Sequence, residues 1–170
     1  YFRDAGVLIS RPLKSSSQSI GVAMKGGHNA EHHNHNDVGS YAIVVADETL
    51  SGEPGGPYHY AGDMWTSKRY TYKSISSFGH PVPVINYTYQ STGKRAQANV
   101  IKADFSKKSD EFFLDLKDVY DIAGLQKLER HFTYSREKNT KLTIEDIFEM
   151  DEAGEFATAI TTLYPWEEVE

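Results

Sequence analysis

The 170-residue chain contains no cysteine. This excludes disulfide bonds and thiolate metal sites, so a metal could be held only by histidine nitrogen or by oxygen ligands. Long apolar runs are also missing: no stretch approaches the roughly 20 residues that a helix needs to cross a bilayer, so we expect no membrane span. The first seven residues lack the charged start, apolar stretch and cleavage site of a signal peptide. The 25% of charged and 39% of hydrophobic residues are typical of a soluble globular protein.

Several signatures of nucleotide and nucleophile chemistry are absent as well. No glycine run is followed by Lys-Ser or Lys-Thr, no Gly-x-Gly-x-x-Gly opens a helix, and there is no Gly-x-Ser-x-Gly turn. The formal net charge of −6 argues against a nucleic-acid partner, because such domains need a basic footprint. Basic pairs such as Lys68-Arg69 and Lys107-Lys108 are interpreted as parts of a solvated surface.

The most distinctive stretch is residues 26–37, which hold four of the seven histidines. His33, His35 and Asp37 are spaced two apart, so in extended backbone their side chains would leave on one face. Imidazole is a good zinc ligand, and this spacing therefore indicates metal binding or catalysis. A solvated loop is the alternative interpretation, and an expression tag is a third, although tags are usually uninterrupted terminal runs.

Short strands at about ten-residue spacing predict an all-β fold, an antiparallel two-sheet β-sandwich formed as a single domain by residues 1–170. No segment has a sustained helical period with caps at both ends. Residues 51–57, rich in glycine and proline, and the aromatic residues 58–72 are expected to be loops. The expected strands cover residues 6–11, 19–25, 39–46, 73–77, 82–89, 95–105, 111–120, 125–136, 141–150 and 155–163.

A three-ligand metal site could be assembled from His35, the loop acid Glu53 and His80, because two imidazoles and one carboxylate form a stable zinc site with water. Taken singly, Glu53 could be an exposed acid in a turn and His80 a histidine at the end of a strand. His33 could bind a carboxylate or transfer a proton, or it could simply face solvent.

Aromatic side chains gather in residues 58–72. Tyr58, Tyr60 and Tyr72 are the candidate substrate-binding residues, because their rings could stack on sugars, as could those of Trp65 and Tyr70. Packing on the edge of the core is the simpler alternative for all five.

Three blocks in order resemble the heparinase II/III-like family of polysaccharide lyases. They are residues 33–41 (HNHNDVGSY), residues 53–60 (EPGG followed by YHY) and residues 78–86 (FGHPVPVIN). The resemblance corresponds to the C-terminal β-sandwich region of the family, whose N-terminal (α/α) toroid is not in these 170 residues. It implies that the whole enzyme cleaves uronic-acid-containing glycans by β-elimination in the cleft between toroid and sandwich, and that it is periplasmic or extracellular.

The resemblance also implies roles for single residues. His33 would face the substrate and neutralise the uronate carboxylate, which acidifies the C5 proton, or assist proton transfer. His35, Glu53 and His80 would hold a structural zinc ion, although the family usually has aspartate where this chain has Glu53. Because the family's catalytic tyrosine base belongs to the toroid, we expect the isolated chain to be inactive.

Two other functions are compatible with the sequence. The first is a non-catalytic module that binds acidic carbohydrate through residues 58–72. The second is a metal-stabilised structural sandwich without a role in sugar binding.

Overall fold

The computed structural model describes residues 1–14, 19–46, 48–53, 59–137, 140–158 and 160. Strands dominate these ranges, and their helical elements are four 3-10 turns of three or four residues. The predicted all-β class is confirmed. No helix in the described ranges is long and apolar enough to cross a membrane. That residues 1–170 form one domain stays a prediction.

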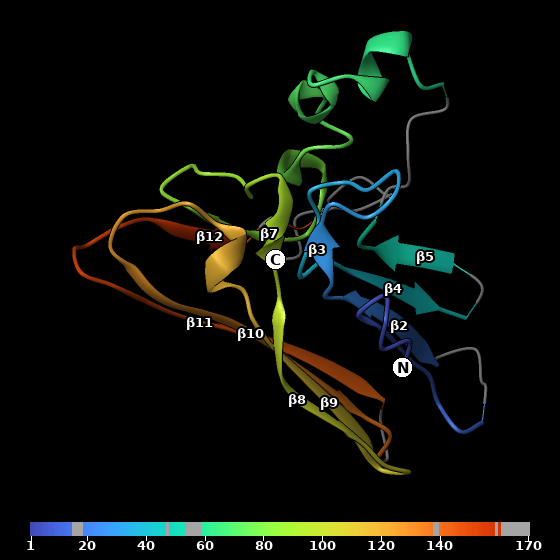
Figure 1. Cartoon of the computed structure of the whole chain (residues 1–170). Coiled ribbons are helices and arrows are strands. Elements are labelled where there is room, and N and C mark those ends of the chain that lie inside the picture. Colours follow the sequence, from blue (N-terminus) through green and yellow to red (C-terminus); the bar gives the residue numbers. More distant parts are fainter. Residues whose placement is uncertain (15–18, 47, 54–58, 138–139, 159, 161–170) are drawn as a thin grey trace, which may run out of the picture.

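The first four-stranded sheet is formed by β1 (Val7–Ser10), β2 (Ile20–Lys25), β4 (Tyr41–Val45) and β5 (Glu48–Ser51). Its order is β1-β2-β4-β5, and every pair is antiparallel. The first two strands form an antiparallel hairpin. The strand after the histidines, β4, lies between β2 and β5 (Figure 1).

The second four-stranded sheet is formed by β8 (Asn99–Phe105), β9 (Ser109–Asp115), β10 (Leu125–Ser135) and β11 (Lys141–Met150). It is also antiparallel, in the order β11-β10-β9-β8. Alternate residues of β9 and β10 are buried, as the period of a strand with one covered face requires. This alternation places one side of the sheet against the core.

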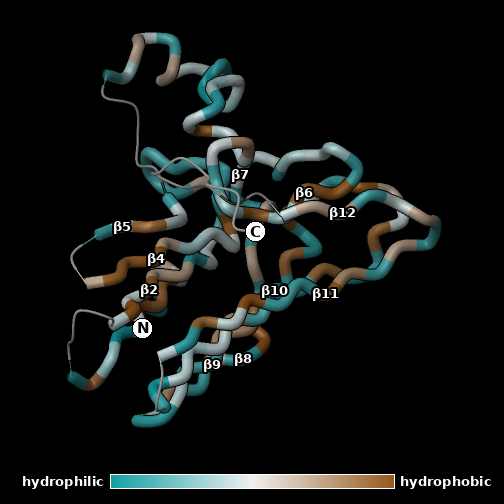
Figure 2. Tube along the Cα trace, turned by 180° about the vertical axis from the view of Figure 1, so that it is seen from behind, coloured by the Kyte–Doolittle hydropathy of each residue, from teal (hydrophilic) through white to brown (hydrophobic). Residues whose placement is uncertain are grey.

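The core lies between the two sheets. Tyr134 of β10 donates its hydroxyl to the Ile20 carbonyl oxygen of β2 at 2.5 Å, and the rings of Tyr41 and Phe132 meet edge to face at 6.2 Å. Figure 2 shows hydrophobic stretches along β2, β4 and β10. Each fully buried Leu, Val or Phe side chain contributes roughly 1.5–3 kcal/mol. The central members are Leu8, Val22, Met24, Phe112, Leu114, Leu128 and Phe132.

Two small antiparallel pairs complete the fold, β3 (His28–Asn29) with β7 (Gly93–Gln97) and β6 (Pro83–Ile85) with β12 (Phe156–Thr158). The 3-10 turns η1 (Gly62–Trp65) and η2 (Arg69–Thr71) belong to a segment that projects beyond the sheets, at the top of Figure 1. The residues that follow this segment return to the histidine stretch, where the Asn36 N–H donates to the Ile75 carbonyl oxygen.

Two expected strands are wrong or much shorter. Residues 73–77 form turns that lead into η3 (Ser77–Gly79), because the Tyr72 carbonyl oxygen accepts from the N–H groups of Ile75 and Ser76. The strand expected over residues 82–89 is only β6. It ends at Asn86 and Tyr87, whose positive φ angles of 48° and 57° form a turn.

Three other boundaries differ from the prediction. Residues 95–105 are split between β7 and β8, because the Ala98 N–H donates to the Gly27 carbonyl oxygen at 2.9 Å. The strand expected to reach residue 120 ends at Asp115 and is followed by η4 (Lys117–Val119). The last strand is β12, and residues 159 and 161–163 of the prediction lie outside the described ranges.

Candidate metal centre and adjoining histidine turn

The histidine tract, as we call residues 26–37, folds into a turn after β3. The prediction of an extended backbone for His33, His35 and Asp37 is wrong. The Asn34 N–H donates to the Glu31 carbonyl oxygen at 3.1 Å, and His33 has a positive φ of 59°. As a result, His33 is exposed, His35 is half-buried and Asp37 is buried. The three side chains therefore do not share one face.

The asparagines between the histidines fix this turn. Asn34 and Asn36 are buried, and the Asn36 backbone accepts from Ser77 Oγ at 2.9 Å and donates to the Ile75 carbonyl oxygen at 2.9 Å. Buried polar groups need such partners, because each unmade hydrogen bond costs about 1–3 kcal/mol. The turn is thereby attached to η3, which precedes His80.

Asp37 neutralises a lysine next to the tract. Its Oδ1 lies 2.5 Å from Lys25 Nζ, which is also 3.3 Å from Glu31 Oε2. Burial raises the pKa of Asp37, while the Lys25 charge acts to lower it. Burial lowers the pKa of Lys25, but the Asp37 and Glu31 carboxylates outweigh burial and raise it. Asp37 thus belongs to an ion pair behind the histidines.

His35, Glu53 and His80 are brought together, as the sequence predicted. One ligand atom of each lies within 4.8 Å of those of the other two. His80 Nδ1 is 2.6 Å from Glu53 Oε2, and the rings of His35 and His80 are 5.1 Å apart between centroids. His80 is fully buried, whereas His35 and Glu53 are half-buried, so the cluster is partly accessible from the surface.

This donor set fits a zinc ion. Two imidazoles and one carboxylate leave a fourth position for water, as in many zinc sites. Two buried atoms of the cluster, Glu53 Oε1 and His80 Nε2, have no hydrogen-bond partner within the described residues. Burial, with smaller contributions from His80 and the Arg69 charge, lowers the pKa of His35 to about 4. A neutral imidazole with a free lone pair is the form that binds metal.

The β-sandwich and its glycines position the ligands. Glu53 follows Gly52, whose φ is +116° and whose added Cβ would lie 2.1 Å from the Tyr41 carbonyl oxygen of β4. His80 follows Gly79, where an added Cβ would lie 2.4 Å from the Lys73 carbonyl oxygen. Only glycine fits either position, because both obstacles are backbone atoms.

The predicted substrate-binding tyrosines are placed differently from one another. The Tyr60 hydroxyl is 3.4 Å from His35 Nε2, next to the metal cluster. Tyr72 instead donates its hydroxyl to Asp63 Oδ1 at 2.5 Å, within its own segment. Tyr58 lies outside the described residues.

Arg69 is buried, so the predicted solvated surface at Lys68-Arg69 is wrong for this residue. Its guanidinium is buried and donates to the carbonyl oxygens of His33 at 2.8 Å, Asn34 at 2.7 Å and Met64 at 3.1 Å. The sequence contains no signal for this role, because all three acceptors are backbone atoms.

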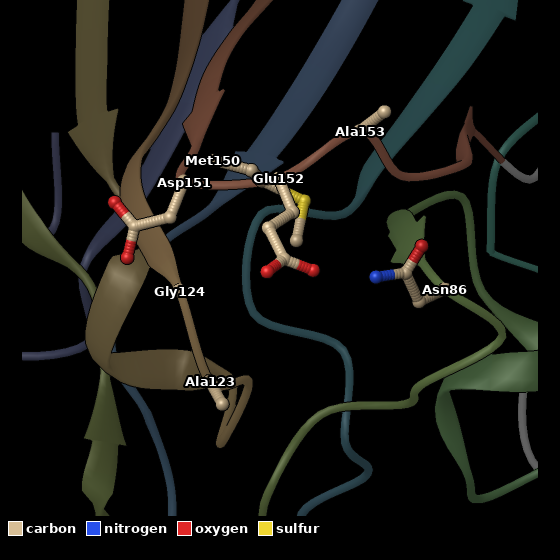
Figure 3. Close-up of a pocket in the computed structure, with 7 residues that line it drawn as sticks. All are labelled: Asn86, Ala123, Gly124, Met150, Asp151, Glu152 and Ala153. Atoms are coloured by element: carbon tan, nitrogen blue, oxygen red, sulfur yellow. The ribbon is translucent and has the colours of Figure 1, made fainter.

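A separate hollow of about 350 Å³ lies between the turn after β6 and the end of β11 (Figure 3). Asn86, Gly124 and Asp151 are among its lining residues, and the Asp151 carboxylate accepts from Gln126 Nε2 at 3.0 Å. None of the three metal-site residues lines this hollow. It therefore adds nothing to the metal centre.

No protein-family model and no curated protein sequence matches the chain. Among solved structures, a mutant of the heparan sulfate lyase HepC from Pedobacter heparinus is similar, with a TM-score of 0.69 and 15% identity over 90% of this chain. A heparinase III with methylated lysines gives a TM-score of 0.67 and 14% identity over 90% of this chain. This chain covers 22% of the length of each. The chain therefore has a heparinase-like fold.

Proposed function

We propose that this chain is part of a polysaccharide lyase that cleaves uronic-acid-containing glycans by β-elimination and that it provides one wall of the active cleft. The observation that carries the proposal is the exposed His33 turn beside the cluster of His35, Glu53 and His80. The heparinase-like fold supports it, because two solved structures with this fold are named as a heparan sulfate lyase and a heparinase.

In this reaction His33 acts on the substrate. An imidazole N–H beside the uronate carboxylate withdraws charge from it and makes the C5 proton more acidic. A base removes that proton, the electron pair forms the C4–C5 double bond, and the C4–O bond breaks as the leaving oxygen takes a proton from the protonated base. The exposure of His33 gives a polymer access to the imidazole.

His35, Glu53 and His80 would hold zinc, which when bound would link the three loops and so keep His33 in place. His33 is joined to this centre through only one intervening residue, Asn34, whose side chain and backbone are both hydrogen-bonded. Loss of the metal is therefore expected to disturb the position of His33.

The base is proposed to come from outside these 170 residues. This chain covers only 22% of each similar solved structure, so most of the length of each of those two proteins has no counterpart in this chain. The resemblance assigns the base to a tyrosine of a helical toroid, which would form the other wall of the cleft. We also propose a periplasmic or extracellular location, where acidic polysaccharides are encountered.

The test is release of unsaturated uronate, followed by ultraviolet absorbance, from heparan sulfate and from alginate. The protein that contains this region together with its toroid should be active, and the 170-residue chain should not be. We expect His33→Ala to lower kcat by about 100-fold or more, the usual contribution of a general acid or base. His131→Ala, in β10 of the second sheet, is the matched control.

Two outcomes contradict the proposal. Cleavage by the isolated chain would show that the base lies within it, and no cleavage of either polysaccharide by the longer protein would remove the lyase assignment for these substrates. The second candidate function, an acidic-carbohydrate-binding module, is favoured by the exposure of Tyr60 and Trp65 beside His33. Binding that depends on His33 in a protein without turnover would support the module.

A further inference from the structure

Two exposed aromatic side chains lie beside the histidine turn. Trp65 is 52% and Tyr60 is 38% exposed, and their rings are stacked 5.1 Å apart with an interplanar angle of 30°. Tyr70 and Tyr72 of the same segment are half-buried, and their hydroxyls donate to Asn34 and to Asp63 respectively. Tyr60 and Trp65 are thus the more exposed rings, whereas the Tyr70 and Tyr72 hydroxyls are hydrogen-bonded to side chains of the protein.

The pair is held in a fixed relation to the turn. The buried Arg69 guanidinium donates to the backbone of both the turn, at His33 and Asn34, and η1, at Met64. It also lies 5.4 Å from the centroid of the Trp65 ring, within the range of a cation–π contact. Two large rings exposed together on a braced segment form an apolar patch, and such patches are suited to ligand binding.

The aromatic surface continues into the candidate active site. The centroids of the His33 and Trp65 rings are 4.9 Å apart, and those of the His32 and His33 rings are 3.9 Å apart. At the opposite end, the Tyr60 hydroxyl borders His35. The surface therefore runs from the histidine that would meet the uronate to the rim of the metal centre.

We propose that Tyr60 and Trp65 form a stacking subsite for a pyranose ring of the glycan, next to the sugar whose carboxylate meets His33. A pyranose presents a flat face of C–H groups, which suits the exposed surface of these rings, while their polar atoms tolerate the surrounding water. The subsite rests on the proposed function for the identity of the neighbouring sugar. Trp65 is the main contact of this subsite, because it provides more exposed surface than Tyr60.

The test uses the 170-residue chain and a heparan sulfate tetrasaccharide, with affinity measured by calorimetry. Trp65→Ala should weaken binding by about tenfold, and Trp65→Tyr should restore most of the affinity, since a smaller aromatic ring still stacks. Phe105→Ala is the matched control, because Phe105 is 41% exposed but belongs to β8 of the second sheet. It should leave the affinity unchanged.

Fluorescence gives a second readout. The chain has two tryptophans, Trp65 and Trp166, so in a Trp166→Phe background the emission reports on Trp65 alone. Binding of the tetrasaccharide should shift or quench this emission. A carboxyl-reduced tetrasaccharide should still change it, but its affinity should no longer depend on His33.

The outcomes separate the subsite from the proposed function. One outcome is that the native tetrasaccharide binds in a His33-dependent way, Trp65→Ala leaves the affinity unchanged and the Trp65 emission does not change on binding. The subsite is then overturned and the proposed function stands. If Trp65 responds equally to both tetrasaccharides and His33→Ala has no effect, the subsite stands and the uronate role of His33 is wrong. If neither tetrasaccharide binds, the subsite is overturned together with the binding role proposed for His33.

Discussion

Arg130 and Asp146 form a bidentate ion pair, with Nε–Oδ1 and Nη2–Oδ2 distances of 2.7 Å each. They are directly opposite one another in the register of β10 and β11. The remaining guanidinium nitrogen, Nη1, donates to the carbonyl oxygens of Gly39 at 2.9 Å and Pro81 at 2.7 Å. One buried arginine thus connects the second sheet to Gly39, two residues after the histidine tract, and to Pro81, the residue after His80.

Replacing Arg130 is therefore expected to weaken both the fold and the metal centre. Arg130→Met should lower the free energy of unfolding by about 3–5 kcal/mol, because Asp146 loses its cation and keeps only the Thr158 hydroxyl as a partner. Urea denaturation measures this loss. The double variant Arg130→Met/Asp146→Leu should recover only part of it, since the Gly39 and Pro81 carbonyl oxygens stay unsatisfied. Full recovery would show that the bonds to these carbonyl groups contribute nothing to stability.

Zinc should stabilise the chain through His35, Glu53 and His80. At 100 times its dissociation constant, a ligand of the folded state adds about 2.7 kcal/mol, so zinc should raise Tm and a chelator should lower it. His80→Ala and His35→Ala should abolish this response, whereas His33→Ala should keep it. Scanning calorimetry with metal analysis checks the prediction. A native protein with no zinc and no zinc-dependent Tm would refute the ligand assignment.

The sheets were predictable because their signals are local. Alternation of buried and exposed residues and turn residues every ten positions placed β1, β2, β4, β10 and β11 to within one or two residues. The strand predicted for residues 73–77 is wrong because the N–H groups of Ile75 and Ser76 form turn hydrogen bonds and not the hydrogen bonds of a β-ladder. The Ile75 carbonyl oxygen accepts from the Asn36 N–H at 2.9 Å, and no local pattern encodes a partner so far away in the sequence.

The site was predictable only in part, for a related reason. The grouping of His35, Glu53 and His80 was one option that the residue types allowed and the one that the resemblance implied. The three residues lie together in the structure, although metal binding stays a prediction. The alternating geometry of the tract was wrong because the Asn34 N–H closes a turn. Arg69 was interpreted as solvated, since its acceptors are carbonyl oxygens that any sequence possesses.

The acid stability of the fold should depend on Asp110. This buried carboxylate of β9 accepts from Ser10 Oγ of β1 at 2.6 Å and pairs with Arg136, so it joins the two sheets. Burial acts to raise its pKa, but the bonds from Arg136 and Ser10 outweigh burial and hold the pKa below the usual value. A carboxylate with a lowered pKa stabilises the fold above its unfolded pKa of about 3.9, and this stabilisation is lost as pH falls through the folded pKa.

Asp110→Asn should therefore cost about 3 kcal/mol at pH 7, as expected for a buried pair that loses one partner. The difference between the two proteins should shrink as the pH falls below about 4, because the carboxylate of the unfolded chain is protonated there first and the folded one only at lower pH. Unfolding by urea at several pH values measures it. A difference that stays constant down to pH 2 would mean that Asp110 acts through its shape alone.

Gly52 offers a way to move Glu53 without changing a ligand. Its φ of +116° is unfavourable for any other residue, and an added Cβ would lie 2.1 Å from the Tyr41 carbonyl oxygen and 2.4 Å from the Ala42 Cα. Because these are backbone atoms of β4, the loop must shift. Gly52→Ala should therefore lower stability by about 1–3 kcal/mol, the usual cost of a strained backbone position, and reduce the zinc-dependent rise in Tm.

Gly62→Ala is the matched control, because nothing lies within 4 Å of its added Cβ. Alanine at this first residue of η1 should leave both quantities nearly unchanged or raise stability by about 0.4–1 kcal/mol. Calorimetry of both variants with and without zinc separates the two effects. If Gly52→Ala lowers Tm yet keeps the full zinc response, the loop shift does not reach Glu53. The carboxylate is then held by His80, 2.6 Å away, and not by the backbone that precedes it.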